Sequence, residues 1–225
     1  MKELKNYSLV LGSASPRRKQ LLEAINLDIR IVVVPIEEKW PDSLKEGEIA
    51  EYLAREKAKA IRPFISNREV LITADTIVCI LGQVLNKPEG LEESRKMLRI
   101  LSGKTHQVFT GVCITSYSGM KCFSVKSDVK FQNLNEDAIE KYISDFKPMD
   151  KAGSYGAQET LPDNYNPCSD AELQFMAESG NENLFEAIQY SGKVKRIPLI
   201  EKIEGSFFNV VGLPLAELYN ELKSF

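Results

Sequence analysis

The stretch from Leu9 to Leu22, LVLGSASPRRKQLL, constrains the fold more than any other part of the chain. The apolar run Leu9–Leu11 ends at Gly12, which breaks a short strand. Ser15 followed by Pro16 then provides a helix cap and a first-turn proline. The sequence therefore predicts a buried strand that passes directly into a helix.

The first turn of this helix carries Arg17 and Arg18, although the helix dipole favours negative charge at an N-terminus. Exposed amides at a helix start, two guanidinium groups and the hydroxyls of Ser13 and Ser15 suit a phosphate-rich anion. The alternative is a solvated basic helix start. These residues are our first candidates for a binding site.

The net charge of −3 over 225 residues argues against general nucleic-acid binding through bulk charge, so any basic site must be local. A hydrophobic content of 43% and a charged content of 27% are typical of a globular protein with a sizeable core. The first residues, MKELKNYS, lack the apolar stretch of a signal peptide, and no run reaches transmembrane length. We therefore expect a cytoplasmic protein.

The cysteines, Cys79, Cys113, Cys122 and Cys168, show no CxxC spacing, and a chain of this size needs no covalent staple. We therefore expect reduced thiols in a cytosol. His106 is the only histidine, so a structural zinc site is not expected. We expect His106 to be a hydrogen-bonded structural residue, with a ligand role as the alternative.

The strand predicted at Val70–Ile80 is apolar except where Asp75 and Thr76 interrupt it. A buried carboxylate is costly unless it is paired, hydrogen-bonded or bound to a metal. Asp75 is therefore the strongest single catalytic candidate, against the alternative of a hydrogen-bonded structural aspartate. A turn at Gly82 gives a hairpin, after which Lys87 can return toward the same site.

The run Ile29–Ile36 reads as a buried strand that delivers Glu37 and Glu38 at its end. Paired carboxylates at such a place are metal-site candidates, although they are also common loop residues. A helix predicted from about Glu46 to Arg62 puts Lys57 on the flank of its apolar stripe. A lysine there either extends to solvent or faces a lined cleft.

The rest of the chain alternates predicted helices and strands around a glycine-containing loop at 147–158, of the kind that often carries binding residues. Residues 159–196 change to a polar composition with a capping box at Ser169 and Glu172, and we interpret them as an insertion near the mouth of the site. The further expected elements are a helix at 91–101 with Leu91, Met97, Leu98 and Leu101 inward, an antiparallel pair at 107–115 and 123–131, a helix capped by Asn135, strands at 197–203 and 207–211, and a terminal amphipathic helix.

Four blocks read together resemble the Maf family of nucleotide pyrophosphatases: GSASPRRKQLL, ADTIV with NKP after it, LSGKTHQVFTGV, and the pair MDKAGSYGAQ and VVGLPL. Their order and spacing follow the family over nearly the whole chain apart from 159–196. The resemblance implies one α/β domain over 1–225, with a long mixed β-sheet flanked by helices and a cleft between two lobes, related to inosine triphosphate pyrophosphatases. It also implies hydrolysis of a nucleoside triphosphate to the monophosphate and diphosphate with a divalent metal, Mg²⁺ or Mn²⁺.

Carried over by position, the resemblance assigns the proton acceptor to Asp75 and further catalytic or binding roles to Ser13, Arg17, Arg18, Glu38, Lys57, Thr76, Lys87 and Gln158. Glu38 and Asp75 are the expected oxygen ligands of the metal. Two departures from the family pattern concern the pocket floor, because Gly12 replaces the usual alanine and Ala157 the usual isoleucine.

The expected substrates are dTTP and UTP, because family members that hydrolyse them carry the residues found here at Arg17, Thr76 and Gln158. Members that prefer methylated guanine nucleotides carry an aromatic residue and a glutamine at the first two of these places. A guanine or modified nucleotide such as 7-methyl-GTP is the first alternative. A phosphatase or ATPase that releases orthophosphate and a regulator that binds nucleotide or nucleic acid without hydrolysis are the others. No membrane or nucleic-acid partner is expected, and a homodimer is left open.

Overall fold

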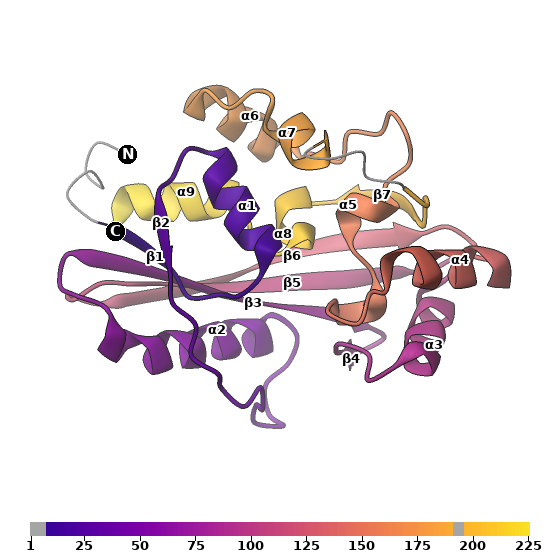
Figure 1. Cartoon of the computed structure of the whole chain (residues 1–225), viewed down its shortest axis with the longest axis horizontal. Helices are drawn as coiled ribbons and strands as arrows, with labels where there is room; N and C mark the ends of the chain where they lie inside the picture. The colour runs from indigo at the N-terminus through magenta and orange to yellow at the C-terminus, as the bar shows by residue number, and fades with distance from the viewer. Residues whose placement is uncertain (1–7, 191–195) are drawn as a thin grey trace.

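The computed structural model describes residues 8–190 and 196–225, which fold around one seven-stranded sheet (Figure 1). The order along the sheet is β2-β1-β3-β5-β6-β7, and β4 pairs with β3. β1 lies parallel to β2 and β3, whereas the remaining pairings are antiparallel. The strands are β1 (Ser8–Leu11), β2 (Ile29–Ile31), β3 (Glu69–Ile80), β4 (Gln83–Leu85), β5 (Thr105–Thr115), β6 (Met120–Phe131) and β7 (Ile200–Glu204).

Helices cover both faces of this sheet, with α2 on one face and α1, α8 and α9 on the other (Figure 1). None of the helices in the described ranges is long and apolar enough to cross a membrane. The helices are α1 (Pro16–Ala24), α2 (Gly47–Ile61), α3 (Leu91–Leu101), α4 (Glu136–Phe146), α5 (Ala157–Thr160), α6 (Asp170–Ser179), α7 (Leu184–Tyr190), α8 (Phe207–Val211) and α9 (Leu215–Ser224), with 3₁₀ turns at Arg62–Phe64 and Ala152–Ser154.

The central strands β3 and β5 are buried along nearly their whole length because both of their faces are covered. α2 lies so close to β5 that a Cβ at Gly111 would come 2.2 Å from the backbone of Ala50. Glycine at this position is therefore what allows the helix to reach the sheet. The expected α/β fold, with a long mixed sheet flanked by helices, is confirmed.

Local start signals for three helices also act as the sequence predicts. Ser15 accepts a hydrogen bond from Arg18 N at the start of α1, and Asn135 accepts one from Ala138 N at the start of α4. The capping box of Ser169 and Glu172 is complete at α6. Whether residues 159–196 are an insertion stays a prediction, and 191–195, like the N-terminal 1–7, lie outside the described residues.

Three expected elements are wrong in detail. β2 ends at Ile31, not residue 36, because β1 ends at its register partner Leu11 and offers no further strand to pair with. Residues 207–211 form α8 and not a strand, because Ser206 caps them by accepting from Asn209 N. Leu91 is 50% exposed because it is the first residue of α3 and extends beyond its packed stripe.

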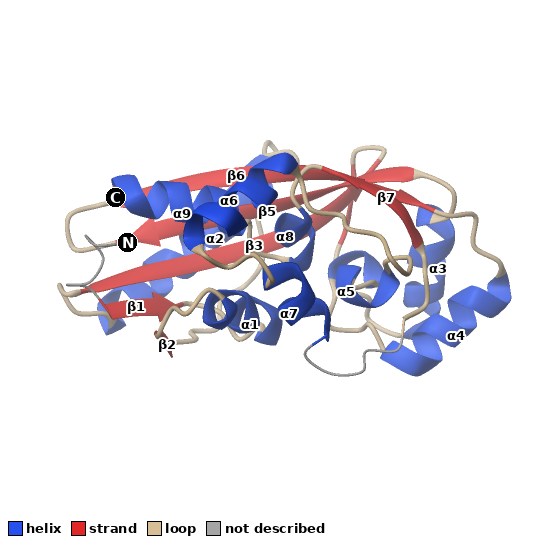
Figure 2. Ribbon diagram, turned by 90° about the horizontal axis from the view of Figure 1, so that it is seen from above, coloured by secondary structure: helices blue, strands red, loops and turns tan. Residues whose placement is uncertain are grey.

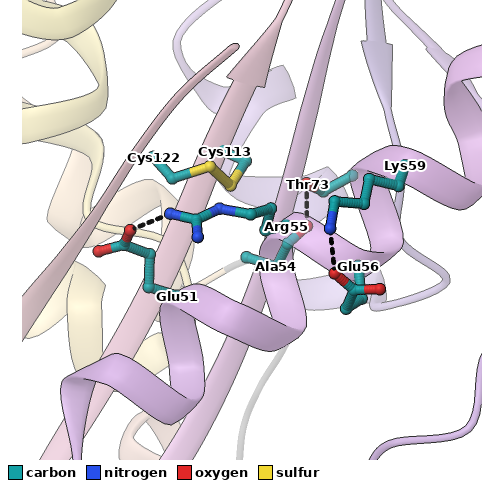
Figure 3. The surroundings of a disulfide bond; sticks show 8 residues. All are labelled: Glu51, Ala54, Arg55, Glu56, Lys59, Thr73, Cys113 and Cys122. Carbon is teal, nitrogen blue, oxygen red and sulfur yellow. Dashed lines mark hydrogen bonds and ion pairs between the residues drawn. A yellow bond between two sulfur atoms is a disulfide. The ribbon is translucent and has the colours of Figure 1, made fainter. Parts of the chain in front are cut away.

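The expectation of four reduced thiols is also wrong, because Cys113 and Cys122 form a disulfide (Figure 3). The antiparallel register puts the two residues directly opposite each other on β5 and β6, with 4.1 Å between their Cα atoms. Cys79 and Cys168 are free. The absence of CxxC spacing and the expected cytosolic location say nothing about the register of β5 and β6, which brings these two cysteines together. The cytoplasmic location stays a prediction.

His106 is a buried structural residue, as expected. Its Nε2 lies 2.7 Å from the Tyr155 hydroxyl, and its ring packs edge-on against Phe131. Burial lowers the pKa of His106 to about 3, while the charge of Asp128 acts in the opposite direction. The imidazole is therefore neutral at physiological pH.

Candidate active site

A cleft of about 660 Å³ is lined by the β1–α1 loop, the start of α1, residues from 33 to 40, α2, β3, the residues after β4, the segment from 150 to 158 and the end of α8 with Gly212. Segments from both ends of the chain therefore meet here. Glu37, which the sequence offered as a metal ligand together with Glu38, is not among the lining residues and pairs with Lys39 instead. The residues that the family resemblance assigns all line the cleft, namely Ser13, Arg17, Arg18, Glu38, Lys57, Asp75, Thr76, Lys87 and Gln158.

The β1–α1 loop presents Ser13 as a hydrogen-bond donor. Gly12 N donates to Ile72 O of β3 (2.8 Å), which fixes the loop against the sheet. Ser15 N (3.2 Å) and Arg18 Nη1 (3.1 Å) both donate to Ser13 Oγ. A hydroxyl has two lone pairs and one proton, so Ser13 keeps its proton for a ligand. A phosphate oxygen is a suitable acceptor for it.

Arg18 points into the protein and joins segments that are far apart in the sequence. Its Nε donates to Gly212 O and its Nη1 to Ala74 O, both at 2.8 Å. Its guanidinium also donates to Ser13 Oγ and, through Nη2, to Thr76 Oγ1 (3.0 Å). Burial lowers the pKa of Arg18, and the charge of Asp75 opposes this effect. Four of the five donors of the guanidinium thus hold the cleft walls together.

Asp75, Lys57 and Glu38 form the charged centre of the cleft. Lys57 Nζ contacts Asp75 Oδ1 and lies 2.8 Å from Glu38 Oε1, while Lys87 Nζ lies 3.9 Å from Glu38 Oε2. Burial is the largest influence on Glu38 and raises its pKa, but the hydrogen bond and charge of Lys57, with Lys87, bring the pKa below its usual value. Both carboxylates therefore converge on one ammonium group, and Asp75 is 7% exposed.

The other end of the cleft holds Arg17 and Gln158. Arg17 Nη1 lies 3.1 Å from Asp150 Oδ2, and Lys151 Nζ lies 3.1 Å from the second oxygen of the same carboxylate. Gln158 Nε2 donates to Ile188 O of α7 (3.3 Å). α7 packs beside α1, the helix that carries Arg17 (Figure 2). Arg17 and Gln158, the two residues expected to contact the nucleobase, both line the cleft.

A profile of the family described as "Maf-like protein" matches residues 8–162 and 164–225. The chain belongs to the Maf family.

Curated relatives of this Maf chain match it over nearly its full length. A protein of Bacteroides thetaiotaomicron named dTTP/UTP pyrophosphatase is 42% identical over 98% of this chain and 97% of its own. Proteins of the same name from Parabacteroides distasonis (41%, covering 100% of both chains) and Christiangramia forsetii (36%, covering 98% and 95%) also match. Among solved structures, a Mycobacterium abscessus dITP/XTP pyrophosphatase aligns with 14% identity and a TM-score of 0.37 over 55% of this chain and 73% of that one.

Asp150 and Lys151 are cleft residues of this Maf protein that the sequence analysis did not single out. Lys151 is buried and contacts both Asp150 and Glu159, which lies 3.4 Å away. Lys151 and Arg17 lower the pKa of Asp150, against the raising effect of burial, which is the largest single influence. The sequence does contain a signal for these two residues, because Asp150 and Lys151 are adjacent charged residues within the MDKAGSYGAQ block.

The Maf-pattern departure at Gly12 has a packing reason in this chain. A Cβ at Gly12 would lie 2.5 Å from Thr73 Cγ2 and 2.7 Å from Ile61 Cδ1. These two side chains fill the space that an alanine methyl group requires. Ala157, the second departure from the family pattern, is buried and lines the cleft.

Proposed function

We propose that this chain is a nucleoside triphosphate pyrophosphatase that hydrolyses dTTP and UTP to the nucleoside monophosphate and diphosphate. Full-length relatives at 36–42% identity carry the name dTTP/UTP pyrophosphatase. The observation that carries the proposal is the meeting, in one cleft, of a buried Asp75 paired with Lys57 and a β1–α1 loop that presents the Ser13 hydroxyl proton. A general base thus lies beside a phosphate-binding wall.

The triphosphate binds along the basic side of the cleft. It carries about four negative charges, which must be neutralised before water can attack. Ser13 donates its hydroxyl proton to a phosphate oxygen, since its two lone pairs are occupied. Lys57 and Lys87 supply positive charge beside Glu38.

Asp75 acts as the proton acceptor. Water attacks the α-phosphorus and forms a new P–O bond, the bond from this phosphorus to the bridging oxygen of the diphosphate breaks, and the water proton passes to Asp75. Lys57 orients the carboxylate by its contact with Oδ1.

We also propose Mg²⁺ or Mn²⁺ as the cofactor, held by Glu38 and Asp75. Both carboxylates approach Lys57 Nζ, so their oxygens lie around one point. Within the described ranges, no three His, Cys, Asp or Glu side chains form a metal site by themselves. This donor set fits a metal that takes one or two carboxylates and completes its shell with substrate phosphates and water. When bound, the metal neutralises part of the phosphate charge.

The base lies against Arg17, Thr76 and Gln158. A uracil or thymine edge presents two carbonyl acceptors and one N–H donor, which a guanidinium, a hydroxyl and an amide can match. A mismatched base leaves these polar groups unpaired, and that cost gives the selectivity.

The test is a panel of dTTP, UTP, CTP, GTP and 7-methyl-GTP with Mg²⁺, in which monophosphate and diphosphate products are measured and substrates are ranked by kcat/KM. We expect dTTP and UTP to rank first, with diphosphate as the second product. A clear preference for a guanine nucleotide supports the 7-methyl-GTP alternative. Release of orthophosphate indicates a phosphatase or ATPase, and binding without turnover indicates a regulator.

A further inference from the structure

A directed chain of hydrogen bonds runs behind the cleft. Arg18 Nη2 donates to Thr76 Oγ1 (3.0 Å), Thr76 Oγ1 lies 2.9 Å from Thr110 Oγ1, and Thr110 Oγ1 lies 3.0 Å from Asn209 O. Thr76 and Thr110 are direct register partners on β3 and β5, so their side chains share one face of the sheet. Thr76 lines the cleft and is half-buried, whereas Thr110 is fully buried.

The direction of every bond in this chain follows from counting protons. Asn209 O is a carbonyl and only accepts, so Thr110 must use its one hydroxyl proton there. Thr110 Oγ1 is therefore the acceptor in its bond with Thr76, and Thr76 is the donor. Arg18 has no acceptor and donates to Thr76 Oγ1. Thr76 has thus spent its proton and one lone pair inside the protein.

The acceptor end of the chain is held firmly. Asn209 is fully buried, and its Nδ2 donates to Val108 O (3.0 Å) and to Ser127 Oγ (2.9 Å). Its backbone N donates to Ser206 Oγ at the start of α8. The carbonyl of Asn209 therefore stays beside Thr110, and rotation of either hydroxyl breaks a buried hydrogen bond.

We propose that Thr110 is a positioning residue for base selection: it keeps the Thr76 hydroxyl proton turned away from the cleft, so that Thr76 offers the substrate an acceptor only. This inference rests on the proposed function and adds to it the polarity of one specificity contact. Uracil and thymine carry an N–H at ring position 3 that an acceptor can receive. Cytosine carries a lone pair at that position, which faces the Thr76 lone pair and is repelled. Thr110 thereby favours UTP and dTTP over CTP without contacting the nucleotide itself.

The experiment compares kcat/KM for UTP and CTP in the wild type, Thr110→Val, Thr110→Ser and Thr73→Val. Thr110→Val removes the acceptor and frees the Thr76 proton to donate into the cleft. We expect the UTP-to-CTP ratio to fall about tenfold or more, with CTP gaining and UTP losing. Thr110→Ser keeps the hydroxyl and restores the ratio. Thr73, a buried β3 threonine that donates to Ala54 O outside the cleft, is the matched control and leaves the ratio unchanged.

A double variant and a substrate analogue make the test independent of folding. Adding Thr110→Val to Thr76→Val should change the ratio no further, because Thr110 acts only through Thr76. The wild type should lose about tenfold or more in kcat/KM on 3-methyl-UTP, which lacks the ring N–H, relative to 5-methyl-UTP.

A folded Thr110→Val enzyme with an unchanged ratio overturns the inference, as do additive effects in the double variant or wild-type turnover of 3-methyl-UTP equal to that of 5-methyl-UTP. In each of these cases UTP is still hydrolysed and the proposed function stands. If the wild type releases no diphosphate from any nucleotide, the proposed function fails, and the inference fails with it.

Discussion

Replacing His106 with glutamine should remove a large part of the acid sensitivity of this protein. His106 is the only histidine in the chain and is buried against Tyr155, with a pKa that burial lowers to about 3. In the unfolded chain its pKa is about 6.5. As the pH falls below that value, the unfolded state binds a proton that the folded state refuses. The stabilisation is therefore fully present above pH 6.5 and is lost progressively toward pH 3.

The size of the effect follows from these two pKa values. pH 5 lies about 1.5 units below the pKa of His106 in the unfolded chain. The free energy of unfolding is therefore about 2 kcal/mol lower at pH 5 than at pH 8. For a chain of this length that corresponds to roughly 4–8 °C in melting temperature. Carboxylates with lowered pKa values, such as Glu38 and Glu69, destabilise the fold on protonation only below about pH 4.5. Buried Glu217, whose pKa burial raises, acts in the opposite direction in both proteins, so the difference between the wild type and His106→Gln from pH 8 to 5 reports on His106.

The assay is urea unfolding at pH 8, 6.5 and 5 for the wild type and His106→Gln, whose amide keeps a hydrogen-bonding group near Tyr155. The wild type should lose about 2 kcal/mol more than the variant across this range. NMR of the single imidazole provides a direct check, since its signals should not titrate above pH 5. Parallel stability curves for the two proteins, or an imidazole midpoint near 6.5, would refute the reasoning.

Three further predictions concern other residues. Asp75→Asn should lower turnover by about 10²–10⁴-fold with the fold retained, measured as diphosphate release; near wild-type turnover contradicts its role as base. Reduction of the Cys113–Cys122 disulfide, whose residues are 9 apart in sequence, should lower the free energy of unfolding by at most about 3 kcal/mol in urea titrations, and a double serine variant should not respond to reductant. Glu172→Gln should cost about 2–4 kcal/mol, because this buried carboxylate accepts bonds at the start of α8, whereas exposed Glu178→Gln should cost little.

The sequence by itself determined the features that depend on near neighbours in the chain. Ser15 and Pro16 start α1, Asn135 starts α4 and a capping box starts α6, because each involves atoms three residues apart. The sequence also indicated Asp75, since a carboxylate inside an apolar strand requires a partner wherever that partner comes from. The position of Asp75 within the strand was enough to predict a charged site. It was not enough to identify Lys57 as the group that contacts Asp75.

Features that depend on register were decided only by the tertiary structure. Cys113 meets Cys122 because β5 and β6 pair in one register, and a shift by one residue would turn the two sulfur atoms to opposite faces. Residues 207–211 contain only apolar residues and one asparagine, which suit a strand or a buried helix, and the cap at Ser206 decided for a helix.

The same holds for the direction of hydrogen bonds at the site. Arg18 reaches Gly212 and Ala74, which are 194 and 56 positions away, and Thr110 meets a carbonyl 99 positions away. A threonine in a sequence is both donor and acceptor, so residue type alone leaves its role at a ligand undecided. The folded chain places a carbonyl beside Thr110, so Thr110 donates its proton to this carbonyl and Thr76 donates its proton to Thr110. Thr76 is then left with a lone pair for the nucleobase.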